Sequence, residues 1–248
     1  MVKGVIIAIV CGFSFFASAQ FDGRGENETS RFRPGVMWFF SGYRPAEEGK
    51  PNKFDRLIFD LTYNDWVGEQ GPFQNSWASI GLNTSLMFDI PLTQGNKVSF
   101  GVGISHQYTP IRHNNHLVID DVANTTTFVL KDSTDLFYKS SLSGNSFSIP
   151  IELRFRNESW KHFKFHIGGK IGYQVSMMAK YGSKIDGHKY IDKRYGFPDQ
   201  AKLVYSAHIR VGIRNWAIFA SYNFNRLFTN SNSTKLNLIQ MGLSISLF

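Results

Sequence analysis

The stretch "LVYSAHIRVGIRNWAIFASYNF", residues 203–224, alternates apolar and polar side chains in two consecutive runs. Every second residue from 203 to 213 is apolar, whereas His208 and Arg210 are among the residues between them. A period of two residues is that of a β-strand with one apolar and one polar face. Only residues 214–215 separate the two runs, so the stretch predicts a tight antiparallel hairpin.

The same alternation recurs along most of the chain, and helical periodicity never runs long. Most of the alternating stretches reach the roughly 9 to 11 residues that a tilted strand needs to cross a bilayer. There are eight, at residues 55–66, 77–90, 97–109, 147–156, 163–176, 203–213 and 216–224 and in the C-terminal stretch "MGLSISLF", 241–248.

These features predict an all-β fold, a transmembrane antiparallel up-and-down β-barrel of about eight strands. Ten strands are the alternative, if residues 125–141 contribute a further pairing. A soluble lipocalin-like barrel or a β-sandwich is the competing fold, because alternation alone does not say which face is buried. Polar faces rich in Arg, Lys and His, and aromatic residues near the strand ends, favour the transmembrane barrel.

The connections between these stretches differ strongly in length. Short ones alternate with long ones, as in outer-membrane barrels that have short periplasmic turns and long extracellular loops. An even number of strands then places both the N-terminus and the C-terminus on the periplasmic side. The short connections are 93–96, 157–162 and 214–215, and the longer ones are 110–144, 181–201 and 229–235.

The first residues carry the features of an export signal. Lys3 precedes an apolar run, and small residues follow it, so residues 1–19 are predicted to be a cleaved signal peptide. Residues 20–50 are expected to form a periplasmic leg or plug segment, and residues 51–248 the barrel. Cys11 is the only cysteine and lies in the signal, so the mature chain would have no thiol.

The composition agrees with an envelope protein. The chain contains 23 Phe, 10 Tyr and 5 Trp, yet its mean hydropathy is only -0.21. Its net charge is +8, or +7 once Lys3 leaves with the signal. For an exported protein, this charge favours outer-membrane lipid and lipopolysaccharide as partners rather than nucleic acid. The expected location is therefore the bacterial outer membrane.

The chain resembles the PorT-like outer-membrane β-barrel proteins of Bacteroidota. The resemblance lies in "FSIPIELRFR" (147–156), in the signal ending "SAQ" (18–20) and in the last hairpin "NFNRLFTNSNSTKLNLIQMGLSISLF" (223–248). It implies an integral outer-membrane barrel that works with other envelope proteins, in a family whose eponymous member is associated with type IX protein secretion. The family has no catalytic residues to transfer to this chain.

The inward faces of the predicted strands carry many charges. In a small barrel, side chains fill the interior, and charges buried there must pair. We therefore expect Asp60 and Glu152 to lie among Arg154, Lys170 and Arg210, with His166 and His208 alongside, in an ion-pair network that closes the lumen. Asp89, Arg156 and Lys164 have the same inward parity.

A non-enzymatic structural or assembly role, linked to protein secretion, is the leading interpretation. A small-solute pore is the alternative, and an outer-membrane lipid-modifying enzyme ranks below it. We expect no catalytic residues, cofactor or metal, because no nucleophile or pair of carboxylates at fixed spacing is evident.

One long connection, "YGSKIDGHKYIDKRYGFPDQ" (181–200), interleaves basic and aromatic residues. At an outer surface, such a composition suits contacts with sugars or phosphates. The candidate contact residues are Lys184, Lys189, Lys193, Arg194 and Tyr190.

Overall fold

The computed structural model describes residues 57–68, 75–93, 97–130, 137–157, 163–185, 188–213 and 215–247. The predicted signal peptide and the leg or plug segment lie outside the described residues.

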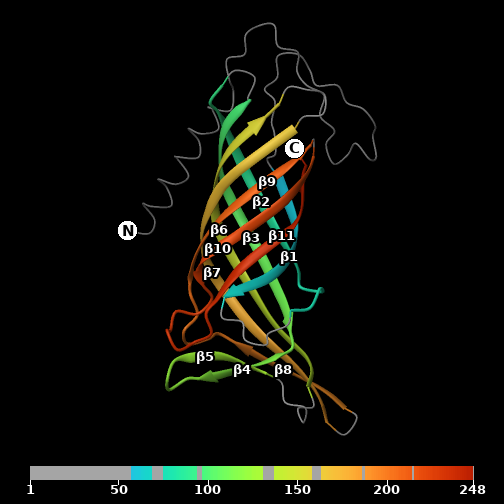
Figure 1. The fold of residues 1–248 in the computed structure, drawn as a ribbon, viewed down its shortest axis with the longest axis vertical. Helices are drawn as coiled ribbons and strands as arrows, with labels where there is room; N and C mark the ends of the chain where they lie inside the picture. Colours follow the sequence, from blue (N-terminus) through green and yellow to red (C-terminus); the bar gives the residue numbers. More distant parts are fainter. Residues whose placement is uncertain are drawn as a thin grey trace, which may run out of the picture.

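The described residues form a closed antiparallel barrel of eight strands (Figure 1). Successive strands around the barrel are hydrogen-bonded, and β1 pairs with β11, which closes the sheet on itself. The eight-stranded prediction is therefore confirmed. The strands are β1 (Leu57–Gly68), β2 (Ile80–Pro91), β3 (Val98–His113), β6 (Phe137–Arg156), β7 (Phe163–Ile185), β9 (Leu203–Ile213), β10 (Trp216–Arg226) and β11 (Leu236–Ser246).

The alternative of ten barrel strands is wrong. Three further strands occur, but β4 (Asn115–Asp120) and β5 (Thr125–Leu130) pair only with each other in a separate two-stranded sheet. The third, β8 (His188–Tyr195), pairs with the last part of β7 beyond the point where β7 leaves β9. The stretch 110–144, predicted as one long connection, is in large part strand because β3 and β6 continue their pairing to His113 and Ser140.

The two ends of the barrel differ as the connection lengths predicted. The strand ends that the short connections join, at residues 91 and 98, 156 and 163, and 213 and 216, lie at one end, which we call the turn end. Residues 57 and 247 also lie there, since Leu247 N donates to Leu57 O at 2.9 Å. The opposite loop end carries β4, β5 and β8 (Figure 1).

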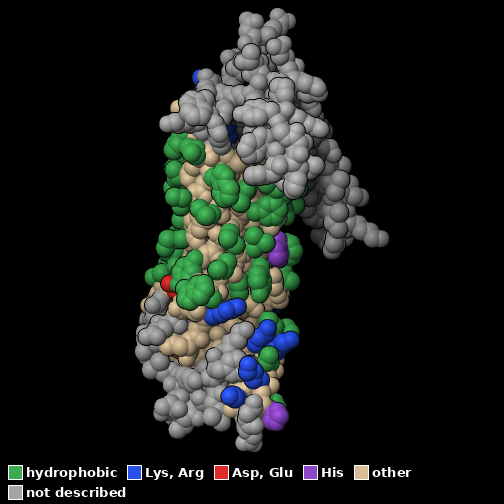
Figure 2. Space-filling view, turned by 90° about the vertical axis from the view of Figure 1, so that its right-hand side faces the viewer, with side chains coloured by type: hydrophobic (Ala, Val, Ile, Leu, Met, Phe, Trp, Pro, Cys, Tyr) green, Lys and Arg blue, Asp and Glu red, His purple; other side chains and the backbone are tan. Residues whose placement is uncertain are grey.

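The polarity of the barrel wall is opposite to that of a soluble barrel. The outward residues Leu61, Ile171 and Ile218 are 55%, 64% and 67% exposed, whereas the inward Asp60 and Arg210 are at most 1% exposed. A lipocalin-like barrel or a β-sandwich would bury the apolar face instead. Figure 2 shows the outward hydrophobic side chains as a broad band over the barrel wall. Within the described residues, no helix has the length and apolar character to cross a membrane.

Aromatic side chains border this apolar band along several strands. In β7, Phe163 and Tyr173 are both exposed and stand ten residues apart. Ten residues of strand at about 3.3 Å each, tilted by about 40°, span about 25 Å, the usual height of the lipid-facing band of an outer-membrane barrel. Exposed aromatic residues also stand eight residues apart, which corresponds to about 20 Å, in β6 (Phe147 and Phe155) and in β10 (Trp216 and Phe224).

The inside of the loop end is apolar, in contrast to the polar interior below it. Nine buried side chains form a cluster there, which we call the apolar cap. The β4–β5 hairpin is held against it because Thr126 Oγ1 donates to Asp199 Oδ1 at 2.6 Å, and Thr126 N donates to Ser233 Oγ at 2.9 Å. The apolar cap comprises Trp66, Ile111, Leu117, Leu142, Met177, Ala179, Phe197, Phe228 and Leu236.

Gly242 lies at the seam where β11 closes the barrel against β1. It pairs with Thr62, and a Cβ atom added to Gly242 would lie 1.9 Å from the carbonyl oxygen of Leu61. Gly242→Ala is therefore expected to force the two strands apart and to lower the free energy of unfolding by about 1 to 3 kcal/mol. A denaturant titration in bilayers measures this change. Equal stability of the variant and the parent would show that the seam has room to relax.

Candidate functional site

Arg210 joins carboxylates from two other strands inside the barrel. Its Nε and Nη2 donate to Asp60 Oδ1 at 3.1 Å and Oδ2 at 2.8 Å, and its Nη1 donates to Glu152 Oε1. Arg210 is on β9, Asp60 on β1 and Glu152 on β6, and each is at most 1% exposed. Barrel closure brings these three inward faces together, and the bidentate contact fixes the orientation of the guanidinium group.

Glu152 continues the contacts toward the turn end. Arg154 Nε donates to Glu152 Oε2 at 2.8 Å, and Arg154 Nη1 donates to Asp89 Oδ1. Arg156 Nη2 then donates to Asp89 Oδ2 at 2.6 Å. The result is an unbroken series of alternating charges, which we call the lumen ion-pair chain. Its members are Asp60, Arg210, Glu152, Arg154, Asp89 and Arg156.

The two histidines predicted to face the lumen lie beside Glu152. His208 Nε2 is 2.8 Å from Glu152 Oε1, and His166 Nδ1 is 3.7 Å from Glu152 Oε2. Both histidines are at most 3% exposed. Glu152 is therefore the centre of the site, because two arginines and two histidines surround its carboxylate.

Lys170 is the one predicted network residue that reaches no carboxylate. It pairs with Ser206 on β9, four residues from Arg210, so its ammonium group lies beside the ion-pair chain rather than in it. Lys170 Nζ lies 5.1 Å from the centroid of the Phe219 ring, which the guanidinium group of Arg210 also contacts at 5.0 Å. Within the described part of the chain, Lys170 Nζ has no hydrogen-bond partner, and a cation–π contact takes the place of the expected ion pair.

Asp89 and Arg156 were not expected to join the network, although their inward parity was readable from the sequence. The missing information is the stagger between strands, because β3 lies between β2 and β6 and the side chains of Asp89 and Arg156 meet only across the lumen. Lys164 is buried as well, and its Nζ donates to Ser246 Oγ at 2.9 Å.

The arrangement fills the middle of the barrel. The charged side chains of the lumen ion-pair chain are paired, as burial requires, and those of Asp60, Glu152, Arg154 and Arg210 are at most 1% exposed. Among the described residues, no group of three or more His, Cys, Asp or Glu side chains is placed to hold a metal ion. The geometry can lock four strands, β1, β2, β6 and β9, to one another across the lumen.

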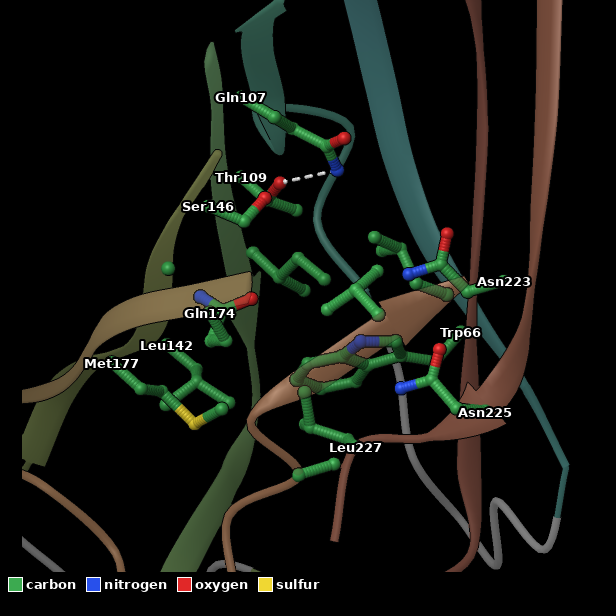
Figure 3. Close-up of a pocket in the computed structure, with 15 residues that line it drawn as sticks. Trp66, Gln107, Thr109, Leu142, Ser146, Gln174, Met177, Asn223, Asn225 and Leu227 are labelled. Atoms are coloured by element: carbon green, nitrogen blue, oxygen red, sulfur yellow. Dashed lines mark hydrogen bonds between the residues drawn. The ribbon is translucent and has the colours of Figure 1, made fainter. Parts of the chain in front are cut away.

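A small cavity borders the apolar cap inside the barrel (Figure 3). It has about 50 Å³ of space for water-sized molecules, which is enough for more than one water. Trp66 and Leu227 contribute apolar walls, while Gln107 donates from Nε2 to Thr109 Oγ1 at 3.1 Å. The other polar side chains that line the cavity are those of Ser146, Gln174, Asn223 and Asn225.

His113 is a buried histidine at the loop end, beyond the apolar band. Its ring lies 5.9 Å from that of Trp66 and 5.2 Å from that of Phe128. Burial lowers the pKa of His113 to about 4, although a backbone hydrogen bond to Asn115 opposes this. The folded protein therefore holds His113 neutral at a pH where an unfolded chain would begin to protonate it.

The stability of the loop end is expected to depend on pH through His113. The pKa of His113 is about 4 in the folded protein and about 6.5 in an unfolded chain, so its contribution to the free energy of unfolding is complete above about pH 6.5 and is lost as the pH falls toward 4. Proteolysis of the loops should accelerate over this window. A His113→Phe variant should show a smaller acceleration, and an equal response in both proteins would exclude His113 as the cause.

The candidate contact residues of the loop lie on the hairpin formed by β7 and β8. All of β8 is exposed, and Arg194 Nη2 donates to Asp121 Oδ1 at 2.7 Å. Figure 2 shows Lys and Arg side chains gathered at this end of the molecule, beyond the hydrophobic band. The pairing register of β7 and β8 places the five candidates on two opposite faces of the hairpin. Lys184, Lys189 and Lys193 share one face, and Tyr190 and Arg194 lie on the other.

The fold and the interior together define a class: a closed eight-stranded β-barrel with an apolar exterior, paired charges in its lumen and an apolar cap at the loop end. No protein-family model matches the chain, and no curated protein matches it.

Among solved structures, the chain is similar to Ail, the attachment invasion locus protein of Yersinia pestis, with 13% identity, a TM-score of 0.32 and coverage of 76% of this chain and 95% of Ail. A second structure, Ail in complex with the heparin analogue sucrose octasulfate, has 15% identity, a TM-score of 0.32 and the same coverage. At this level, the similarity assigns neither a family nor a function.

Proposed function

We propose that the protein is an integral outer-membrane β-barrel. The observation that carries this proposal is the reversed polarity of the barrel, with exposed aliphatic residues outside and buried charges inside. A closed barrel satisfies all its backbone hydrogen bonds internally, which is what a lipid environment demands. The loop end would face the cell exterior and the turn end, with residues 57 and 247, would face the periplasm.

The proposed role is that of a non-enzymatic structural or assembly component of the envelope. The paired charges and the apolar cap support a scaffold because both fill the lumen rather than line an open path. The resemblance to PorT-like proteins adds a link to protein secretion. In this role, lipid holds the barrel, while the loops and residues 20–50 offer surfaces to other envelope proteins.

Two measurements test the proposal. Membrane fractionation should place the tagged protein in the outer membrane, and extraction in mild detergent should recover subunits of a secretion machinery with it. A protein that stays alone after such extraction would contradict the assembly role but not the membrane location.

Two further measurements address the alternative functions. Conductance of the purified protein in planar bilayers would favour the small-solute pore. Altered acylation of lipid A after deletion of the gene would favour the lipid-modifying enzyme.

A further inference from the structure

A β-bulge changes which face of β7 looks outward. Asn145 of β6 pairs with Ser176, but the next residue of β6 pairs with Gln174, so Val175 is an extra residue in β7. Before the bulge, even-numbered residues of β7 such as Lys170 are buried. After the bulge, the odd-numbered Met177 is buried instead. The even-numbered residues that follow therefore lie on the outer wall.

Four lysines share this outer face of the β7–β8 hairpin. Lys180 pairs directly with Lys193, and Lys184 pairs directly with Lys189. Directly paired residues project to the same side of a sheet with their Cβ atoms about 5 Å apart. Without the bulge, Lys180 and Lys184 would have pointed toward the inside of the barrel. We call the surface of Lys180, Lys184, Lys189 and Lys193 the lysine face.

The lysine face places four positive charges close together on one surface. Like charges placed directly opposite each other destabilise a strand pair. Among the described strands, β8 pairs with β7 alone, whereas β7 also pairs with β6 as far as Ser183. The carboxylate of Asp121, which follows β4, pairs with Arg194 on the opposite face of the hairpin. Within the described residues, Lys180, Lys184 and Lys193 form no ion pair with a carboxylate.

The lysine face lies beyond the apolar band, which Tyr173 borders on β7. Met178 is the last apolar side chain of β7 before Lys180 on this face. At about 3.3 Å per residue and a tilt of about 40°, Lys180 stands about 18 Å and Lys184 about 28 Å above the level of Tyr173. Both lysine pairs thus lie above the lipid headgroups, which extend only about 5 to 8 Å beyond the hydrocarbon region. Ile191, 59% exposed, lies between the two pairs.

We propose that the lysine face is a binding site for the phosphate groups of lipopolysaccharide. Each lysine pair would take one phosphate, and the two pairs are about 13 Å apart along the strands. At this height above the apolar band, both pairs would meet phosphates of the core sugars rather than those of the diglucosamine headgroup. The site rests on the proposed outer-membrane location, with the loop end outward, and it gives the chain a specific lipid partner.

The test measures binding of lipopolysaccharide to the full chain, refolded into detergent from inclusion bodies so that no lipopolysaccharide is carried over. Rough lipopolysaccharide should bind, and the same material stripped of phosphate should bind more weakly. K180Q/K193Q and K184Q/K189Q should each weaken binding about threefold, and the quadruple variant about tenfold, as expected for exposed charge pairs. Inorganic phosphate at the same phosphate concentration should not compete.

A charge-matched control is K202Q/R226Q, which removes two exposed positive charges at the loop end outside the hairpin. It should bind as the parent does, and all variants should keep the gel mobility shift of a folded barrel. The proposal is overturned if the quadruple variant or stripped lipopolysaccharide binds unchanged. It is equally overturned if the control loses as much affinity, or if inorganic phosphate competes fully. None of these results affects the fractionation that tests the membrane location.

Discussion

Glu152→Gln is expected to destabilise the barrel by about 3 kcal/mol, because it removes the charge that holds two buried arginines. Arg210 and Arg154 both donate to Glu152, and His208 lies 2.8 Å from it. Glutamine has nearly the same shape, so the effect comes from the lost charge rather than from a cavity. Arg210 keeps Asp60 and Arg154 keeps Asp89, which is why total unfolding is not expected.

A denaturant titration of the protein in bilayers measures this loss, with Asp121→Asn as the control. Asp121 also pairs with an arginine, but its side chain is 67% exposed, and exposed pairs contribute little to stability. Conductance of Glu152→Gln should be recorded in the same bilayers. Unchanged stability together with a new conductance would contradict a structural role for the ion-pair chain and would favour a gated pore.

Ile167→Arg is expected to destabilise the protein by about 2 to 4 kcal/mol in a bilayer, because it places a charge near the bilayer midplane on the lipid face. Ile167 lies between the aromatic residues Phe163 and Tyr173 of β7 and is 48% exposed. In a soluble protein, an arginine at so exposed a position would change stability by less than about 0.5 kcal/mol. The size of the loss of stability in Ile167→Arg therefore shows whether Ile167 faces lipid or water.

Val129→Arg is the matched control for this prediction. Val129 is 49% exposed, almost as exposed as Ile167, but it lies in β5 beyond the apolar band. Unfolding in phosphatidylcholine bilayers should be easier for Ile167→Arg and unchanged for Val129→Arg. If both variants lose the same amount of stability, or neither does, the apolar band is not in lipid.

The alternation of single residues predicted much of the barrel. It located all eight strands, because each strand has one face in each environment and a period of two follows from that alone. It also marked Asp60, Glu152, Arg154 and Arg210 as inward residues. The lengths of the connections predicted which barrel end carries loops.

The alternation did not predict which charged side chains pair across the lumen. Asp60 and Arg210 are 150 residues apart, and Lys170 has the same inward parity as Arg210, yet only Arg210 meets a carboxylate. Which charges meet depends on the stagger with which neighbouring strands pair around the barrel. The local alternation of side chains carries no information about that stagger.

At the loop end, too, the sequence did not predict how side chains pack together. Apolar residues such as Leu117 and Phe197 occur in stretches predicted as connections, 110–144 and 181–201, but in the structure they pack into or against the barrel mouth. The extra residue at Val175 then reverses the parity of β7, so the lysines beyond it face outward rather than inward.

By itself, the sequence determined that the chain forms strands with one apolar and one charged face, because that information is local and repeats every second residue. The tertiary structure alone decided which charges pair, what caps the lumen and where the loop lysines point. Those outcomes depend on register, closure and one bulge, which are set by contacts between residues far apart in the chain.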